Sequence, residues 1–199
     1  MISVRPSSLR RHLLVSLLGA LLSIPTTTAV AGVRLGDAAP DFTLPDGAAH
    51  PITLESFRGR VFVMDFTASW CVACRTALPT LATLTARYAE RGVVLITVVI
   101  DASRANADRF LAEVMPHHAM TVLYDPTARL LARFGAAGMP ALYVIDGGGI
   151  VRFIDSGYDA DRLTAVGTVL DALLPNTTTP MLEPSPIPRP LPPPLGDDR

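Results

Sequence analysis

Blocks of apolar residues alternate with mixed polar segments along the middle of the chain, and they predict alternating strands and helices. Apart from Asp65, residues 61–67 and 93–100 are almost continuously apolar, which is typical of strands covered on both faces. Between them, an apolar residue recurs every three or four positions from Leu78 to Tyr88, which is helical spacing. This segment therefore predicts a strand–helix–strand unit of an α/β domain.

The rest of the domain shows the same two patterns, with proline and glycine at the boundaries. The further elements that we expect are, in chain order, a β-hairpin within 37–60 that ends in one helical turn, a helix over 101–114, a strand over 121–124, a short helix over 126–134, a strand hairpin over 141–155 and a helix ending at 174. Either Asp101 or Ser103 is expected to cap the first of these helices, and Asp159 the last. The elements together predict one domain at residues 35–174.

The two ends of the chain differ in composition from this domain. Residues 1–31 combine a basic start, an apolar run over 13–24 and a small-x-small site ending at Ala31, which predicts an export signal peptide. The run is shorter than the roughly 20 residues of a spanning helix, but an uncleaved membrane anchor stays open as the alternative. Residues 175–199 hold half of the chain's 18 prolines and predict a proline-rich disordered tail without a core.

Composition and charge exclude several classes of function. The 17 basic side chains are all arginines, so catalysis by a lysine Schiff base is excluded. Without residues 1–31, fourteen arginines face eighteen acidic residues, and the arginines are scattered along the chain. A chain of this charge, without a basic patch, is not expected to bind nucleic acid.

The two cysteines of the chain, Cys71 and Cys74, lie where the first buried strand gives way to a helix. The unpaired N–H groups and the dipole of a helix N-terminus stabilise a thiolate and lower the pKa of a cysteine there. Cys71 comes first and is expected at an exposed tip, where it would attack a substrate disulfide. Cys74 is expected one turn further in, where it would resolve the mixed disulfide.

A purely structural role fits the cysteine pair less well. A structural disulfide between positions this close would constrain almost no loop and would stabilise the fold little. A structural zinc site needs about four ligands, and the sequence has neither a second cysteine pair nor a His-x-x-x-His motif. The spacing and the strand–helix context favour redox chemistry.

Several motifs resemble a known family. Asp65-Phe66 followed by Trp70-Cys71-x-x-Cys74 and a proline five residues later resembles the thioredoxin superfamily. The segments 40–45, 52–60 and 138–146 resemble the secreted thioredoxin-like proteins of the TlpA and ResA type. The resemblance covers about residues 35–174. It implies a thioredoxin fold, an α/β arrangement with a mixed central β-sheet flanked by helices and an N-terminal β-hairpin extension.

The resemblance also assigns roles to single residues. Asp65 would be the buried acid that exchanges protons with Cys74, and burial would raise its pKa into a useful range. The resemblance also implies a cis bond between Met139 and Pro140. Trp70 directly precedes Cys71, and this position indicates a flat surface beside the thiol, so Trp70, Met139 and Pro140 would together form the substrate-binding surface.

Two sequence features near the cysteines compare this chain with particular members of the superfamily. ResA-type proteins carry an acid three positions after the second cysteine, where this chain has Ala77. Val72 and Ala73, between the cysteines, resemble the residues at the same place in the motif of the C-terminal thioredoxin-like domain of the membrane reductant DsbD. This resemblance favours a reducing role.

We therefore expect an exported, periplasmic or secreted thiol–disulfide oxidoreductase acting on protein substrates. The resemblance suggests a reductant for cytochrome c maturation or metal-handling proteins, recharged by a DsbD-type membrane protein, with no cofactor and no metal. One alternative is a thiol peroxidase, although Ala68 replaces the Thr or Ser expected before a peroxidatic cysteine. The other is a non-catalytic copper-binding module using the cysteines and the Met- and His-containing loop 115–120.

Overall fold

The central sheet has five strands and mixed directions. The computed structural model describes residues 32–116, 120–157 and 161–174. In spatial order the strands are β5 (Thr121–Tyr124), β4 (Val94–Val99), β3 (Phe62–Thr67), β6 (Ala141–Ile145) and β7 (Val151–Ser156). β3, β4 and β5 run parallel, whereas β6 pairs antiparallel with both β3 and β7. All residues of β3 and β6 are buried, as the continuous apolar pattern predicts for central strands.

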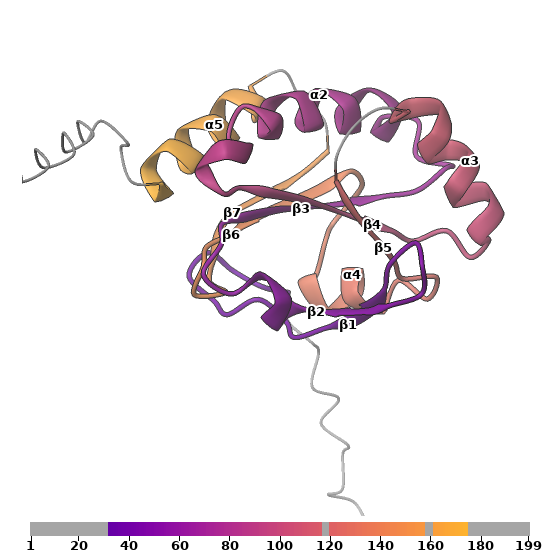
Figure 1. Ribbon diagram of the computed structural model, residues 1–199, viewed down its shortest axis with the longest axis horizontal. Helices are drawn as coiled ribbons and strands as arrows, with labels where there is room; N and C mark the ends of the chain where they lie inside the picture. Colours follow the sequence, from indigo (N-terminus) through magenta and orange to yellow (C-terminus); the bar gives the residue numbers. More distant parts are fainter. Residues whose placement is uncertain (1–31, 117–119, 158–160, 175–199) are drawn as a thin grey trace, which may run out of the picture. The chain divides into compact units, whose positions relative to one another are not determined.

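Helices cover both faces of the sheet. Figure 1 shows α2 (Cys74–Ala86), α3 (Arg104–Val114) and α5 (Arg162–Leu173) on one side and α4 (Arg129–Phe134) on the other. The crossovers β3–α2–β4 and β4–α3–β5 each step to the next parallel strand in the same direction, so α2 and α3 lie on the same face.

The N-terminal extension is the expected β-hairpin. It consists of β1 (Thr43–Pro45) and β2 (Pro51–Thr53), followed by the 3₁₀ turn η1 (Leu54–Phe57). A second 3₁₀ turn, η2 (Ala89–Arg91), connects α2 to β4. The hairpin lies on the same side of the sheet as α4 (Figure 1).

The same N-terminal segment reaches both outer strands of the central sheet. Ala38 forms an isolated antiparallel bridge with Ile150, the residue before β7, and Asp46 forms another with Leu123 of β5. The backbone of Val151 also exchanges hydrogen bonds with this segment, accepting from Gly36 N and donating to Asp37 O. Residues 36–46 are thus bonded to the sheet at both of its edges.

An aromatic cluster joins the sheet to α4. The rings of Phe66 on β3, Phe134 on α4 and Tyr143 on β6 lie with their centroids 4.5–5.9 Å apart, and all three side chains are buried. Burying one such side chain contributes about 1.5–3 kcal/mol, so this cluster is one of the contacts that hold α4 on the sheet.

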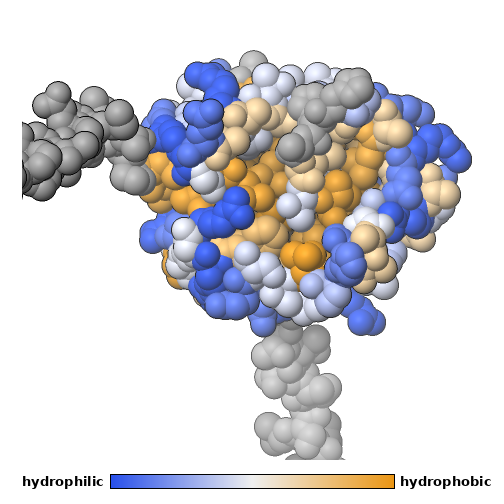
Figure 2. Space-filling model, viewed as in Figure 1, coloured by the Kyte–Doolittle hydropathy of each residue, from blue (hydrophilic) through white to orange (hydrophobic). Residues whose placement is uncertain are grey.

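Figure 2 shows hydrophobic residues gathered at the centre of one face, with hydrophilic residues around them.

The sequence-based boundaries differ from the structure mainly at helix starts. The helix predicted over 101–114 begins at Arg104, because Ser103 is its cap and accepts a hydrogen bond from Asn106 N. The helix predicted over 126–134 begins at Arg129, because the carboxylate of Asp125 accepts from the backbone of the first helical residues. Asp159, the cap predicted for the last helix, lies outside the described residues, as do the predicted signal peptide and tail.

Among the residues that the structure describes, none of the helices combines the length and the apolar character needed to cross a bilayer.

Candidate active site

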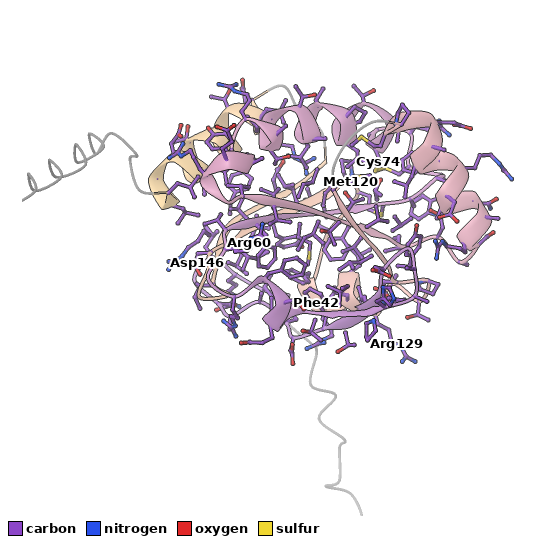
Figure 3. The ribbon with its side chains drawn as sticks, viewed as in Figure 1. Phe42, Arg60, Cys74, Met120, Arg129 and Asp146 are labelled. Atoms are coloured by element: carbon purple, nitrogen blue, oxygen red, sulfur yellow. A yellow bond between two sulfur atoms is a disulfide. The ribbon has the colours of Figure 1, made fainter. Side chains whose placement is uncertain are left out.

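Cys71 and Cys74 form a disulfide at the N-terminal end of α2 (Figure 3). The sulfurs are 2.03 Å apart and the Cα atoms 5.3 Å apart. α2 begins at Cys74, so Cys71 lies in the turn between β3 and the helix rather than in the first helical turn. The backbone N–H of Cys74 donates to the sulfur of Cys71 over 3.2 Å. This donor at the helix start would stabilise negative charge on Cys71 once the disulfide is reduced.

The structure corrects the prediction that Cys71 stands at an exposed tip. Cys71 is only 7% exposed and Cys74 is fully buried. The turn folds back on itself, because Cys71 N donates to Ala68 O, and the disulfide draws the Cys71 sulfur towards the helix. The neighbours of Cys71 are instead exposed, Trp70 by 62% and Val72 by 82%. The two side chains that flank Cys71 in the turn are thus apolar and exposed, whereas Cys71 itself is covered.

Asp101 holds the turn that carries Trp70 and Cys71. Its carboxylate accepts hydrogen bonds from both the backbone N–H, over 2.8 Å, and the hydroxyl of Ser69. Asp101 lies two residues after the end of β4, and Ser69 lies two residues after the end of the neighbouring parallel strand β3. The carboxyl ends of parallel strands meet at one edge of a sheet, which is the sequence signal that points to this pairing. The sequence pattern had predicted only a capping role for Asp101.

We expect the replacement Asp101→Ala to lower the free energy of unfolding by about 1–3 kcal/mol, since Ser69 N would lose its partner in a part-buried site. Urea denaturation of the oxidised protein measures the change. Asp37→Ala is the matched control, because Asp37 also accepts from a backbone N–H, that of Arg34, but in an exposed position. Equal losses in the two variants would contradict a special role of Asp101.

Asp65 lies buried in the middle of β3. Its side chain is 1% exposed, and neither carboxylate oxygen has a hydrogen-bond partner among the described residues. Burial raises the pKa of Asp65 from 3.8 to about 7, and the positive charge of Arg162 partly offsets the increase. The acid therefore changes protonation near neutral pH, as a group that exchanges protons with a thiol must.

Arg162 is a charged residue of this region that was not predicted from the sequence. Its side chain is 3% exposed, and Nη2 lies 3.8 Å from Oδ1 of Asp65. Nε lies 3.0 Å from Oδ2 of Asp155, and Nη1 donates to the carbonyl of Gly157. The signal was present, because Arg162 is followed at helical spacing by Val166 and Leu170, the two other buried residues of α5.

Met139 and Pro140 lie at the sheet edge from which the cysteine turn leaves. The peptide bond between them is cis. Phe66 of β3 pairs with Ala141, so Pro140 is level with Thr67, the last residue before the turn. Pro140 is buried and Met139 is half-buried against the core. The carbonyl of Pro140 accepts a hydrogen bond from Gly157 N over 2.8 Å.

Arg75, the cation next to Cys74 in sequence, is already compensated. Its guanidinium lies 2.8 Å from the carboxylate of Glu113 on α3 and 5.4 Å from the centre of the Phe110 ring. These contacts tie α2 to α3 and leave little uncompensated positive charge for a thiolate.

Comparisons with known proteins identify the family. The sequence pattern of the Redoxin family matches residues 34–172. The chain belongs to the Redoxin family.

Similar proteins and a similar structure are named for thiol–disulfide exchange. The chain is 29% identical over 135 residues to the thiol-disulfide oxidoreductase ResA of Oceanobacillus iheyensis, and the match covers 65% of this chain and 69% of that protein. The chain is 26% identical over 145 residues to ResA of Geobacillus thermodenitrificans, and the match covers 73% of this chain and 82% of that protein. A crystal structure of a Chlorobium tepidum protein assigned as a thiol:disulfide interchange protein DsbE has a TM-score of 0.67 and 32% identity, covering 71% of this chain and 99% of that one.

These similarities confirm the predicted thioredoxin fold and the resemblance to TlpA- and ResA-type proteins. The redoxin is a protein thiol–disulfide oxidoreductase.

Met115 and Met120, at the two ends of segment 115–120, pack against the core of the redoxin. Met115 is buried, and the sulfur of Met120 accepts a hydrogen bond from Thr97 over 3.4 Å. His117 and His118 lie outside the described residues. Within the described ranges, no three His, Cys, Asp or Glu side chains gather to hold a metal ion. The copper-binding alternative therefore gains no support from the two methionines.

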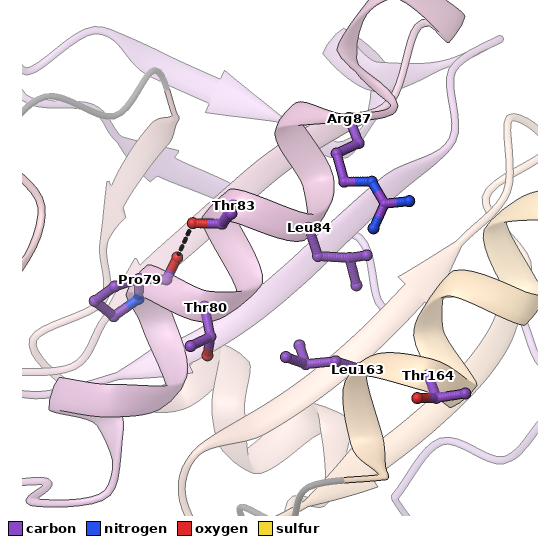
Figure 4. Close-up of a pocket in the computed structure, with 7 residues that line it drawn as sticks. All are labelled: Pro79, Thr80, Thr83, Leu84, Arg87, Leu163 and Thr164. Atoms are coloured by element: carbon purple, nitrogen blue, oxygen red, sulfur yellow. Dashed lines mark hydrogen bonds between the residues drawn. The ribbon is translucent and has the colours of Figure 1, made fainter.

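A groove of about 510 Å³ lies between α2 and α5 of the redoxin (Figure 4). Leu84 and Leu163 point into it from the two helices, and the hydroxyl of Thr83 donates to the carbonyl of Pro79 at its side. Neither the cysteines nor Asp65 line the groove. We therefore place the reaction at the disulfide and not in this groove.

Proposed function

We propose that the redoxin is an exported reductant of protein disulfides, in which Cys71 attacks and Cys74 resolves. The weak stabilisation of the Cys71 sulfur carries this proposal. Its hydrogen-bond donor among the described residues is a single backbone N–H, the two residues between the cysteines are apolar, and Arg75 is compensated by Glu113. A strong oxidant owes its potential to a strongly stabilised thiolate, so a weakly stabilised one favours giving electrons away.

The reaction proceeds in two exchanges. The Cys71 thiolate attacks one sulfur of the client disulfide, forming a mixed disulfide and releasing the other client sulfur as a thiolate. Cys74 then loses its proton and attacks the sulfur of Cys71, which releases the second client thiolate and leaves the Cys71–Cys74 disulfide. Two electrons pass to the client, and its two thiolates take up protons. A membrane thiol reductant of the DsbD type would return the redoxin to its dithiol form.

Asp65 serves as the base for the second exchange. The thiol of Cys74 is buried and cannot give its proton directly to solvent. Asp65 is buried as well, and its pKa of about 7 makes a substantial fraction ionised at neutral pH. We infer that Asp65 accepts the Cys74 proton, through water, and later returns it to solvent.

The clients would dock on the edge formed by Trp70, Met139 and Pro140. Two exposed apolar side chains, Trp70 and Val72, offer contact area to a protein segment and shield the sulfur from water. The export pattern of residues 1–31 supports an extracytoplasmic site of action. Apocytochromes c and metal-handling proteins with oxidised cysteines are the client classes that we expect.

Cys74→Ser tests this function by trapping. The variant can make the first attack but cannot complete the second, so mixed disulfides on Cys71 should accumulate in the producing cell and be identified by mass spectrometry. The double variant Cys71→Ser/Cys74→Ser is the control and should trap nothing. Recovery of no exported client, or equal recovery with the double variant, would contradict a role in protein disulfide reduction.

A further inference from the structure

We propose that Arg162 is a positioning residue that sets the protonation of Asp65 and thereby the pH range of the step in which Cys74 releases the client. The proposal rests on the proton-accepting role of Asp65 proposed above. It is carried by the placement of one buried guanidinium between two acids that come from different strands.

The guanidinium of Arg162 is shared unequally. It lies 3.0 Å from the carboxylate of Asp155 on β7 but 3.8 Å from that of Asp65 on β3. A third contact goes to the carbonyl of Gly157. Asp155 is 30% exposed and therefore hydrated, whereas Asp65 is buried and depends on the protein for its electrostatic environment.

Within the part of the chain that the structure describes, the other groups facing Asp65 carry no charge that could replace this contact. Its cross-strand neighbours are Thr97 on β4 and Leu142 on β6. α2 begins with Cys74, which is uncharged in the disulfide, and Arg162 is the charged group among the described residues that shifts the pKa of Asp65. α5 contributes Arg162, and β7 contributes Asp155 on the far side of the guanidinium.

This arrangement gives Asp65 an intermediate acidity. An arginine bound to Asp65 alone would keep the acid ionised throughout the physiological range, and an absent arginine would leave a buried carboxyl that stays protonated. Because Arg162 is held closer to Asp155, its charge offsets only part of the cost of burial, and the pKa of Asp65 remains about 7. The redoxin thus keeps its proposed base near the midpoint of its titration.

Arg162 also connects the acid to the substrate-binding edge. Gly157, which accepts from Arg162, donates its N–H to the carbonyl of Pro140. Gly157 has φ of +95°, a conformation that a residue with a side chain rarely adopts. A variant at position 162 could therefore disturb the edge as well as the charge, so the test needs variants that separate the two effects.

The experiment follows the titration of Asp65 directly, by ¹³C NMR of labelled aspartate carboxyls in the oxidised protein, alongside the pH profile of client reduction. Arg162→Met removes the charge and should raise the Asp65 midpoint by about 1–3 pH units. Because less Asp65 would be ionised, reduction at pH 7 should slow by about tenfold or more, and its pH profile should move in the same direction. Arg162→Lys keeps the charge and should return the midpoint to within about one unit of the unmodified protein.

The replacement Asp155→Asn should shift the titration midpoint of Asp65 in the opposite direction. It removes the competing carboxylate, so Arg162 should act more strongly on Asp65 and the midpoint should fall. This variant decides the question if Arg162→Met does not fold. Arg152→Met is the matched control, because Arg152 forms a more exposed ion pair with Asp146 on the same strand hairpin and should change neither readout.

The outcomes separate this proposal from the proposed function. An Asp65 midpoint unchanged in both Arg162→Met and Asp155→Asn would overturn the role of Arg162, whatever the base for Cys74. A midpoint that moves while the pH profile of reduction stays fixed would show instead that Asp65 is not that base, and it would overturn the link to client release.

Discussion

Replacing Cys71 by serine should reduce the rate of client disulfide reduction by at least about 10³-fold, because the attacking sulfur is lost and a serine hydroxyl is not ionised near neutral pH. The buried Cys74 cannot take over the first attack, since its side chain is fully covered. The reduction of insulin by the dithiol form of the redoxin, followed by precipitation of the free insulin chain, measures the loss.

Two controls make this result specific. Circular dichroism of Cys71→Ser should be close to that of the reduced unmodified protein, which shows that the fold is kept. The turnover of hydrogen peroxide by the unmodified redoxin should be negligible beside its reduction of insulin, because Ala68 stands where a thiol peroxidase has Thr or Ser. Residual insulin reduction above about 0.1% in Cys71→Ser, or fast peroxide turnover, would contradict the assignment of Cys71 or of the reaction.

Replacing Asp65 by asparagine should stabilise the oxidised protein at pH 8 by about 2–4 kcal/mol and have little effect at pH 4. The pKa of Asp65 is raised from 3.8 to about 7 by burial, so the folded state favours the protonated acid. Between these values unfolding releases a proton, and stability falls as the pH rises. A difference of about three units corresponds to about 4 kcal/mol once the pH is above the folded pKa. Asparagine carries no charge and escapes this loss.

Urea denaturation at several pH values measures the effect, with the disulfide intact so that neither cysteine titrates. Asp37→Asn is the control, because that carboxylate is exposed and its replacement should not produce the same pH dependence. A constant difference between Asp65→Asn and the unmodified protein across pH 4 to 8 would mean that Asp65 has an ordinary pKa. It would also remove the physical basis for its role as a base near neutrality.

The sequence predicted the elements of the domain well, because each depends on local patterns. The apolar runs that became β3 and β4, and the helical spacing from Leu78 to Tyr88, report burial directly. Helix starts were less accurate, since side chains such as that of Asp125 decide where the first turn begins. The covering of Cys71 was not predicted either, because it depends on how the turn folds back.

The residues that support the site were harder to find than the cysteines. The pairing of Asp101 with Ser69 and that of Arg162 with Asp65 join segments far apart in the chain, and no local pattern records such contacts. Each of the two residues Asp101 and Arg162 nevertheless has a recognisable signal in the sequence. Asp101 follows a central strand, and Arg162 occupies the apolar face of its helix. An arginine on a buried helix face predicts a buried acid partner, and Asp65 is such an acid.

The bridges that residues 36–46 make to β5 and β7 have a further consequence for the protein as a solute. Unprotected outer strands offer free N–H and C=O groups to the strands of other molecules and so promote aggregation. Here Ala38 and Asp46 occupy positions along both borders with backbone from the same chain. The N-terminal segment therefore helps to prevent edge-to-edge association of the sheet with other molecules, a role separate from thiol–disulfide exchange.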